Sequence, residues 1–231
     1  TGNGTKDDPY IINSADELAY LVSSKADATA GKYFEIAEDI GTIVLQSQDF
    51  AAEITALDSA AAVQAYFENE EYVFTEWIEK GWEQACFAGN FNGNGVKIYG
   101  LYTVSDTNAG LFSTVDAGAA IRNVVVLNAY FHSLSSTANY QVGAIAAVTS
   151  NTGYGADAAG VVWLDGCVVG NCYMRNDASD LARSGVLFGA ASSDSVVIDN
   201  CMVYGNDARH SATAGDHSVA MPLINTTNNA I

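Results

Sequence analysis

Basic residues are scarce in this chain. It carries 9 Lys and Arg residues against 27 Asp and Glu residues, for a formal net charge of −18 over 231 residues. Such a charge repels the phosphate backbone of nucleic acids and anionic membrane surfaces. We therefore expect no nucleic-acid partner.

Long apolar runs are absent as well. The longest runs, such as residues 124–127 and 161–164, fall far short of the roughly 20 residues that cross a bilayer. No basic and apolar leader opens the sequence. We expect no membrane insertion, and both ends look like cuts within a longer, multidomain chain.

The sequence also lacks the common catalytic and metal-binding motifs. It has no CxxC pair, no HExxH, no GxSxG and no phosphate-binding loop followed by a helix. The four cysteines, Cys86, Cys167, Cys172 and Cys201, are interpreted as small buried side chains, with a disulfide as the alternative. We expect no catalytic residues, no metal site and no cofactor, although calcium binding stays open.

The chain divides into two regions near residue 90. Residues 1–90 hold 17 acidic and 4 basic residues, and no Glu follows Glu83. Glu favours helices, whereas Asp and Asn favour turns, so the architecture changes with the charge. We expect a single domain with an N-terminal cap and first strands (1–46), an acidic helical insertion (47–81) and a repetitive part (82–231).

Helix signals are confined to the first region. Ser14 and Glu17 have the spacing of a capping box, and Leu18, Leu21 and Val22 give residues 15–24 one apolar face. Residues 33–36 alternate as a strand does. The Ala- and Glu-rich segment 49–80 contains no glycine and predicts one or two helices.

From residue 91 onward the sequence repeats. Residues 121–129, 164–172 and 198–206 align without gaps, and a second apolar element recurs at 109–115, 142–148 and 185–191. Short strands with Gly and Asn turns fit a sandwich, a barrel or a β-helix. The alignment favours a β-helix, in which equivalent residues stack: Val124, Cys167 and Cys201 in one column, and Val126, Val169 and Val203 in another.

Three motifs resemble a known family. Residues 2–21 (GNGTKDDPYIINSADELAYL), 91–102 (FNGNGVKIYGLY) and 109–129 (AGLFSTVDAGAAIRNVVVLNA) are similar in content and order to motifs of the GLUG-repeat surface proteins of Gram-positive bacteria. Asn92 and Val96 depart from the usual Asp and His, and segment 47–81 lies outside the pattern. The resemblance implies an all-β fold, a right-handed single-stranded parallel β-helix with an N-terminal capping helix and a helical insertion. It also implies an extracellular, secreted or wall-attached location.

Function is harder to predict from the residues. Aromatic side chains form many carbohydrate and protein-contact sites, and Tyr72, Trp77 and Tyr154 are the candidate binding residues. Trp82 and Phe74 are interpreted as core residues instead. We expect a non-catalytic module for adhesion, glycan binding or scaffolding, whose partner is a polysaccharide or a host or cell-surface protein. The alternatives are a polysaccharide lyase or glycoside hydrolase with an atypical site, and a docking module that uses its acidic insertion.

Overall fold

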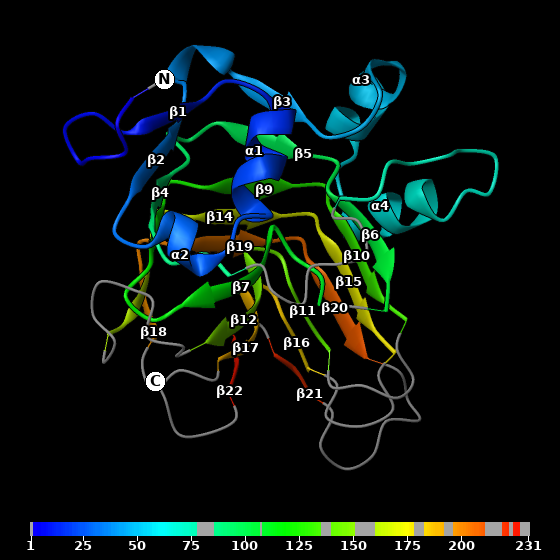
Figure 1. Ribbon diagram of the computed structural model, residues 1–231. Helices are drawn as coiled ribbons and strands as arrows, with labels where there is room; N and C mark the ends of the chain where they lie inside the picture. Colours follow the sequence, from blue (N-terminus) through cyan, green and yellow to red (C-terminus); the bar gives the residue numbers. More distant parts are fainter. Residues whose placement is uncertain are drawn as a thin grey trace.

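The structure is a computed structural model that describes residues 2–77, 86–106, 108–134, 140–150, 160–177, 183–191, 196–210, 219–221 and 224–226. Its strands form five parallel sheets, and within each sheet the order of the strands follows the chain (Figure 1). Sheet 1 contains β1 (Tyr10–Ile12), β2 (Tyr33–Ile36), β4 (Asn90–Asn92), β8 (Ala120–Arg122), β13 (Val162–Asp165) and β18 (Val196–Asp199). Sheet 2 contains β3 (Thr42–Val44), β5 (Lys97–Tyr99), β9 (Val125–Leu127), β14 (Val168–Gly170) and β19 (Met202–Tyr204).

The other three sheets are shorter. Sheet 3 contains β6 (Tyr102–Ser105), β10 (Tyr130–Ser133), β15 (Tyr173–Asn176) and β20 (Asp207–His210). Sheet 4 contains β11 (Gln141–Gly143), β16 (Arg183–Gly185) and β21 (Val219–Met221). Sheet 5 contains β7 (Phe112–Asp116), β12 (Ala146–Ser150), β17 (Phe188–Ala191) and β22 (Ile224–Thr226). Each later pass of the chain thus adds one strand to every sheet.

The fold class predicted from the sequence, an all-β single-stranded parallel β-helix, is wrong. The described chain is mixed: it has four α-helices beside its strands, and the strands form five separate parallel sheets, none of which closes. The helices are α1 (Ala15–Val22), α2 (Ala26–Thr29), α3 (Gln48–Ala56) and α4 (Ala60–Phe67), with a 3₁₀ turn at Glu38–Ile40. Helices α1, α3 and α4 are each stabilised by a Ser side chain that caps a backbone N–H group at the helix start. The sheets stay separate because turns interrupt the strands between them.

The turn residues have the backbone conformation that the sequence predicts. Every non-glycine residue with positive φ in the described chain is an asparagine: Asn94, Asn123, Asn128, Asn171 and Asn200. Asn tolerates this conformation better than other residues that have a side chain. The Asn123 amide donates to Asn92 Oδ1 at 3.0 Å and the Asn200 amide to Asp165 Oδ1 at 3.1 Å, so each ties its turn to the preceding pass.

The predicted alignment of the repeats is confirmed by the strand register. Val126, Val169 and Val203 are partners on adjacent strands of sheet 2. The column predicted to contain Val124, Cys167 and Cys201 is also in register. The Val168 N–H donates to Val124 O at 2.8 Å, and the Met202 N–H donates to Cys167 O at 2.9 Å. Val126 and Val169 are fully buried, and this register therefore builds a continuous apolar core.

Helix α1 confirms the predicted Ser14 cap and apolar face, while Glu17 reaches back to Asn13, one residue before the cap. Ser14 Oγ accepts a hydrogen bond from the Glu17 N–H at 3.1 Å, and Glu17 Oε2 accepts one from the Asn13 N–H at 2.6 Å. Leu18, Leu21 and Val22 are all at most 3% exposed and pack into the main core. Burying a side chain of this size stabilises the fold by roughly 1.5–3 kcal/mol, and α1 is thereby held on the sheets.

The helical insertion lies where the chain could have added an early strand to sheet 3. The pass that supplies β2 and β3 continues into α3 and α4, and it rejoins sheet 5 through the bridge between Phe87 and Val115. Helix α4 contacts β10 and β15 and stands beside sheet 3 (Figure 1). The insertion therefore covers part of the outer face of that sheet.

Candidate functional site

Two of the three residues predicted to bind a ligand, Tyr72 and Trp77, lie in the described part of the chain. Tyr154 lies outside the described residues, as does Trp82, which was interpreted as core. Tyr72 is half-buried in the insertion, where its ring centroid lies 5.3 Å from those of Phe50 and Tyr66. Trp77 is only 6% exposed, and its indole N–H donates to Leu111 O at 3.3 Å. Both side chains contribute to packing.

Trp77 nevertheless lines a hollow beside α1. This hollow, of about 520 Å³, also includes Tyr20, Gln46, Asp16 and Glu76. Tyr20 is 79% exposed and stands on the outer side of α1. The hollow thus combines two aromatic side chains with two carboxylates.

The outer face of sheet 3 carries a column of tyrosines. Tyr102, Tyr130 and Tyr173 are register partners on β6, β10 and β15, and their rings are stacked with centroids 5.6 and 5.3 Å apart. Tyr130 and Tyr173 are at most 3% exposed. Stacked aromatic rings bury a large area, and this column forms a second apolar core outside the first.

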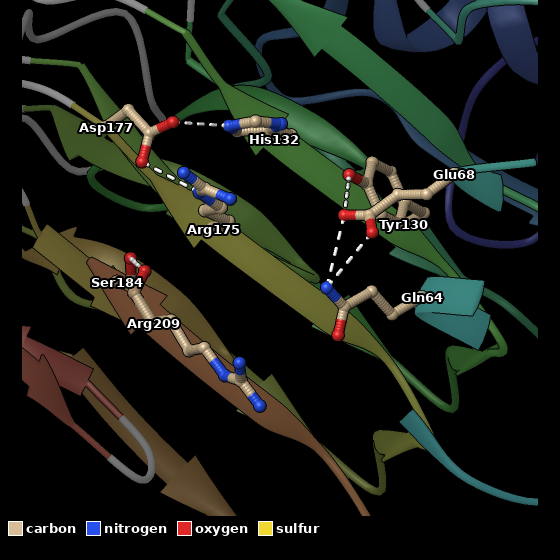
Figure 2. A network of polar contacts seen from close by, with 8 residues as sticks. All are labelled: Gln64, Glu68, Tyr130, His132, Arg175, Asp177, Ser184 and Arg209. Carbon is tan, nitrogen blue, oxygen red and sulfur yellow. Dashed lines mark hydrogen bonds and ion pairs between the residues drawn. The ribbon is translucent and has the colours of Figure 1, made fainter. Parts of the chain in front are cut away.

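Helix α4 covers this tyrosine column. The Phe67 ring stacks on that of Tyr102 with centroids 5.4 Å apart, and Glu68 Oε1 accepts a hydrogen bond from Tyr130 Oη at 2.9 Å. The Gln64 amide donates to both oxygens of Glu68, which lies between Gln64 and Tyr130 (Figure 2). Desolvation, followed by the bond to Glu68, raises the pKa of the Tyr130 hydroxyl.

A polar network follows the same face beyond α4. His132 Nε2 lies 2.8 Å from Asp177 Oδ2, and Arg175 Nε donates to Asp177 Oδ1 at 2.8 Å, so that Asp177 joins the two (Figure 2). Burial opposes ionisation of Asp177, but the bonds from Arg175 and His132 outweigh it and lower the pKa of this carboxyl. Arg209, on the next strand, pairs with Asp207 and lies 5.6 Å from the Tyr173 ring centroid.

This network has the parts for proton transfer. An ionised carboxylate only accepts hydrogen bonds, so His132 Nε2 carries the hydrogen and Nδ1 is the basic nitrogen. Within the described ranges, no Ser, Thr or Cys side chain hydrogen-bonds to His132. Nor do the described residues contain a group of three or more His, Cys, Asp or Glu side chains that could hold a metal ion.

Sequence reasoning missed the outer face of sheet 1. Trp163 on β13 is 46% exposed, although Val162 and Leu164 on either side of it are fully buried. The signal was available, because a strand of alternating inward and outward residues places Trp163 and Asp165 on the same outer face. A hollow of about 450 Å³ lies on this face and includes Lys6, Asn92 and Arg122.

Comparisons with protein-family models, curated proteins and solved structures found no match for this chain. Among the described residues, no helix combines the length and the apolar character needed to span a bilayer.

Proposed function

We propose that this chain is a non-catalytic binding module of a secreted or cell-surface bacterial protein, which serves in adhesion, glycan binding or scaffolding. The observation that carries the proposal is the in-register stacking of the sheets, which places outward side chains in rows at the regular spacing of the strands. On sheet 1, for example, Asn92, Arg122 and Asp165 follow one another on adjacent strands. A row of this kind suits a ligand that itself repeats, such as a polysaccharide.

Two further observations support an extracellular binding role. The resemblance of the three motifs to GLUG-repeat surface proteins favours a location at the cell surface and a place within a longer chain. The formal charge of −18 argues against nucleic acids and anionic membranes as partners. Polysaccharides and proteins are the partners that remain.

The test is a binding panel with the purified chain. Immobilised neutral and acidic polysaccharides, together with extracellular host proteins, are probed by surface plasmon resonance. The proposal predicts saturable binding to at least one class of ligand, with the bound ligand recovered intact. Absence of binding across the whole panel would contradict it.

A polysaccharide lyase is the second candidate function, because the polar network spans three neighbouring strands of sheet 3. His132 Nδ1 would accept a proton from the carbon beside a uronate carboxylate, the bond to the leaving sugar oxygen would break, and a carbon–carbon double bond would form. Arg175 and Arg209 would offset the charge that develops on the carboxylate. Ultraviolet absorbance of unsaturated products that is lost in His132→Ala would establish this candidate over the first.

A further inference from the structure

We propose that the outer face of sheet 1 binds an acidic polysaccharide, with Trp163 as a platform for a sugar ring and with Arg122 and Lys6 as partners for its carboxylates. This inference rests on the proposed binding function and assigns it a place and a class of ligand. The face extends over β2, β4, β8 and β13.

Trp163 is exposed on the outer face of sheet 1. Its register partners on the flanking strands are Ala120 and Val197, which are much smaller, so the indole is the largest side chain in that part of its column. It is 46% exposed although its strand neighbours are buried. An exposed aromatic ring on a flat sheet offers an apolar face on which a sugar ring can stack.

Arg122 on the same face has no ion-pair partner among the described residues. Its register partner is Asp165, but Asp165 Oδ1 accepts a hydrogen bond from the Asn200 amide at 3.1 Å. Arg122 is exposed, and no ion pair in the described part of the chain includes it. A guanidinium can bind a carboxylate with two parallel hydrogen bonds, and Arg122 is free to do so.

The hollow on this face also has a shape and a charge that suit an acidic ligand. Its volume is about 450 Å³, and its charged side chains are Lys6, Arg122 and Glu35. The hollow thus has an excess of positive charge in a chain whose net charge is −18. Asn90 adds an amide that can donate to and accept from sugar hydroxyls, whereas the Asn92 amide is engaged with Asn94 and Asn123.

The spacing of these groups suits a chain of sugars. Adjacent strands lie ~4.8 Å apart and alternate residues ~6.6 Å apart, which places Arg122 and Trp163 ~8 Å from each other. A sugar stacked on Trp163 therefore leaves its neighbour within reach of Arg122. Asp165 and Glu35 lie at the borders of this track, where they can accept hydrogen bonds from hydroxyls but would repel further carboxylates.

The experiment compares polygalacturonate with its methyl-esterified form, which lacks the charge. We expect the intact chain to bind polygalacturonate at least about tenfold more tightly than the ester, since each charge-assisted hydrogen bond contributes about 1.5–3 kcal/mol. Arg122→Gln and Trp163→Ala should each weaken binding to polygalacturonate about tenfold or more. Lys97→Gln and Met202→Ala, which change exposed residues of sheet 2, should leave binding unchanged.

Two outcomes overturn the inference. If Arg122→Gln and Trp163→Ala bind as the intact chain does, while circular dichroism shows both folded, the site lies elsewhere and the binding function stands. If the intact chain binds neutral glycans or proteins but not polygalacturonate, the ligand class is wrong. Failure of the intact chain on every ligand of the wider panel would instead contradict the proposed function itself.

Discussion

At the scale of single residues, Asn128 connects a turn of the sheets to the insertion. Its φ is +51°, and its buried amide donates to Ile54 O at 2.7 Å and to Leu57 O at 2.9 Å. Those carbonyls lie at the C-terminal end of α3, where Ile54 O otherwise accepts only a long bond from the Leu57 N–H, at 3.4 Å. One side chain thus satisfies the helix end and holds the turn.

Replacement of Asn128 should therefore be costly. We expect Asn128→Ala to lower the free energy of unfolding by about 3 kcal/mol, because Leu57 O and Ile54 O each lose a hydrogen bond from the amide and alanine is strained at positive φ. Asn171 has φ +54° at the equivalent turn, and its amide makes no described hydrogen bond to α3, so Asn171→Ala should cost only about 1 kcal/mol. Urea denaturation measures both values, and equal losses would contradict the role assigned to the Asn128 amide.

Cys167 and Cys201 form the second informative contact at this scale. All four cysteines are free thiols, and Cys167 is fully buried whereas Cys201 is partly exposed. The register pairs Val168 with Met202, and the Met202 N–H donates to Cys167 O at 2.9 Å, so Cys167 and Cys201 are neighbours in adjacent passes and the predicted column is confirmed. The nearby Cys167 thiol lowers the pKa of Cys201 to about 7, while the pKa of Cys167 is raised.

The reactivity of Cys201 should show this contact. We expect alkylation of Cys201 by iodoacetamide to rise with a midpoint near the pKa of about 7. Cys167→Ala should move the midpoint up, toward the ordinary value of 9.0. Mass spectrometry of the alkylated peptide follows this change. An unchanged midpoint in the variant would refute an effect of the Cys167 thiol on the pKa of Cys201.

At the scale of elements, the insertion is held by aromatic packing. Phe67 is 4% exposed, and its ring lies 5.4 Å from that of Tyr102 and 4.6 Å from that of Phe74. Phe67→Ala should lower the free energy of unfolding by about 3–5 kcal/mol, because it leaves a cavity between α4 and sheet 3. The urea midpoint gives the size of the effect.

Val73 provides the control for this substitution. It belongs to the same insertion but is 87% exposed. Val73→Ala should change the free energy of unfolding by no more than about 0.5 kcal/mol. If the two variants lost similar stability, the aromatic cluster would not be what holds the insertion.

The elements also show how far sequence reasoning reaches. The capping box of α1, the strand at 33–36 and the repeat register were predictable, because each depends on local patterns or on like residues stacking. The fold class was not predicted correctly, because the helices were treated as additions to a single-stranded β-helix. The docking of α4 on Tyr102, Tyr130 and Tyr173 depends on contacts between residues far apart in sequence, which no local pattern contains.

Candidate binding residues are harder to predict from local patterns. Tyr72 and Trp77 are predicted to bind because aromatic side chains cluster at the end of the insertion, and the structure places both in packing contacts. Trp163 was overlooked, although its place between two inward residues predicts exposure. Burial of an aromatic side chain depends on which element covers its sheet, and that information lies outside the strand itself.

At the scale of the whole molecule, the buried phenols and thiols predict how stability depends on pH. Desolvation raises the pKa of Tyr66, Tyr102, Tyr130 and Tyr173, and it raises the pKa of Cys172 to about 12. A raised pKa in the fold means that the stabilisation is complete below the unfolded values, 9.0 for Cys and 10.0 for Tyr, and is lost as pH rises above them.

We therefore expect the urea midpoint to fall steeply between about pH 9 and about pH 12. The part of the tyrosinate absorbance that comes from these four hydroxyls should appear together with unfolding, because burial in the fold keeps them protonated. Titration of all the tyrosines near pH 10 in a chain that remains folded would contradict the burial described for Tyr130 and Tyr173.

The proposal that the exposed face of sheet 1 recognises an acidic glycan is tested most directly by amide hydrogen exchange of the intact chain with and without polygalacturonate. We expect slower amide exchange over β4, β8 and β13 and the turns beside them, and an unchanged exchange rate over sheet 3. Protection over β15 and β20 instead, around Arg175 and Arg209, would contradict it and would move the site to the polar network of sheet 3.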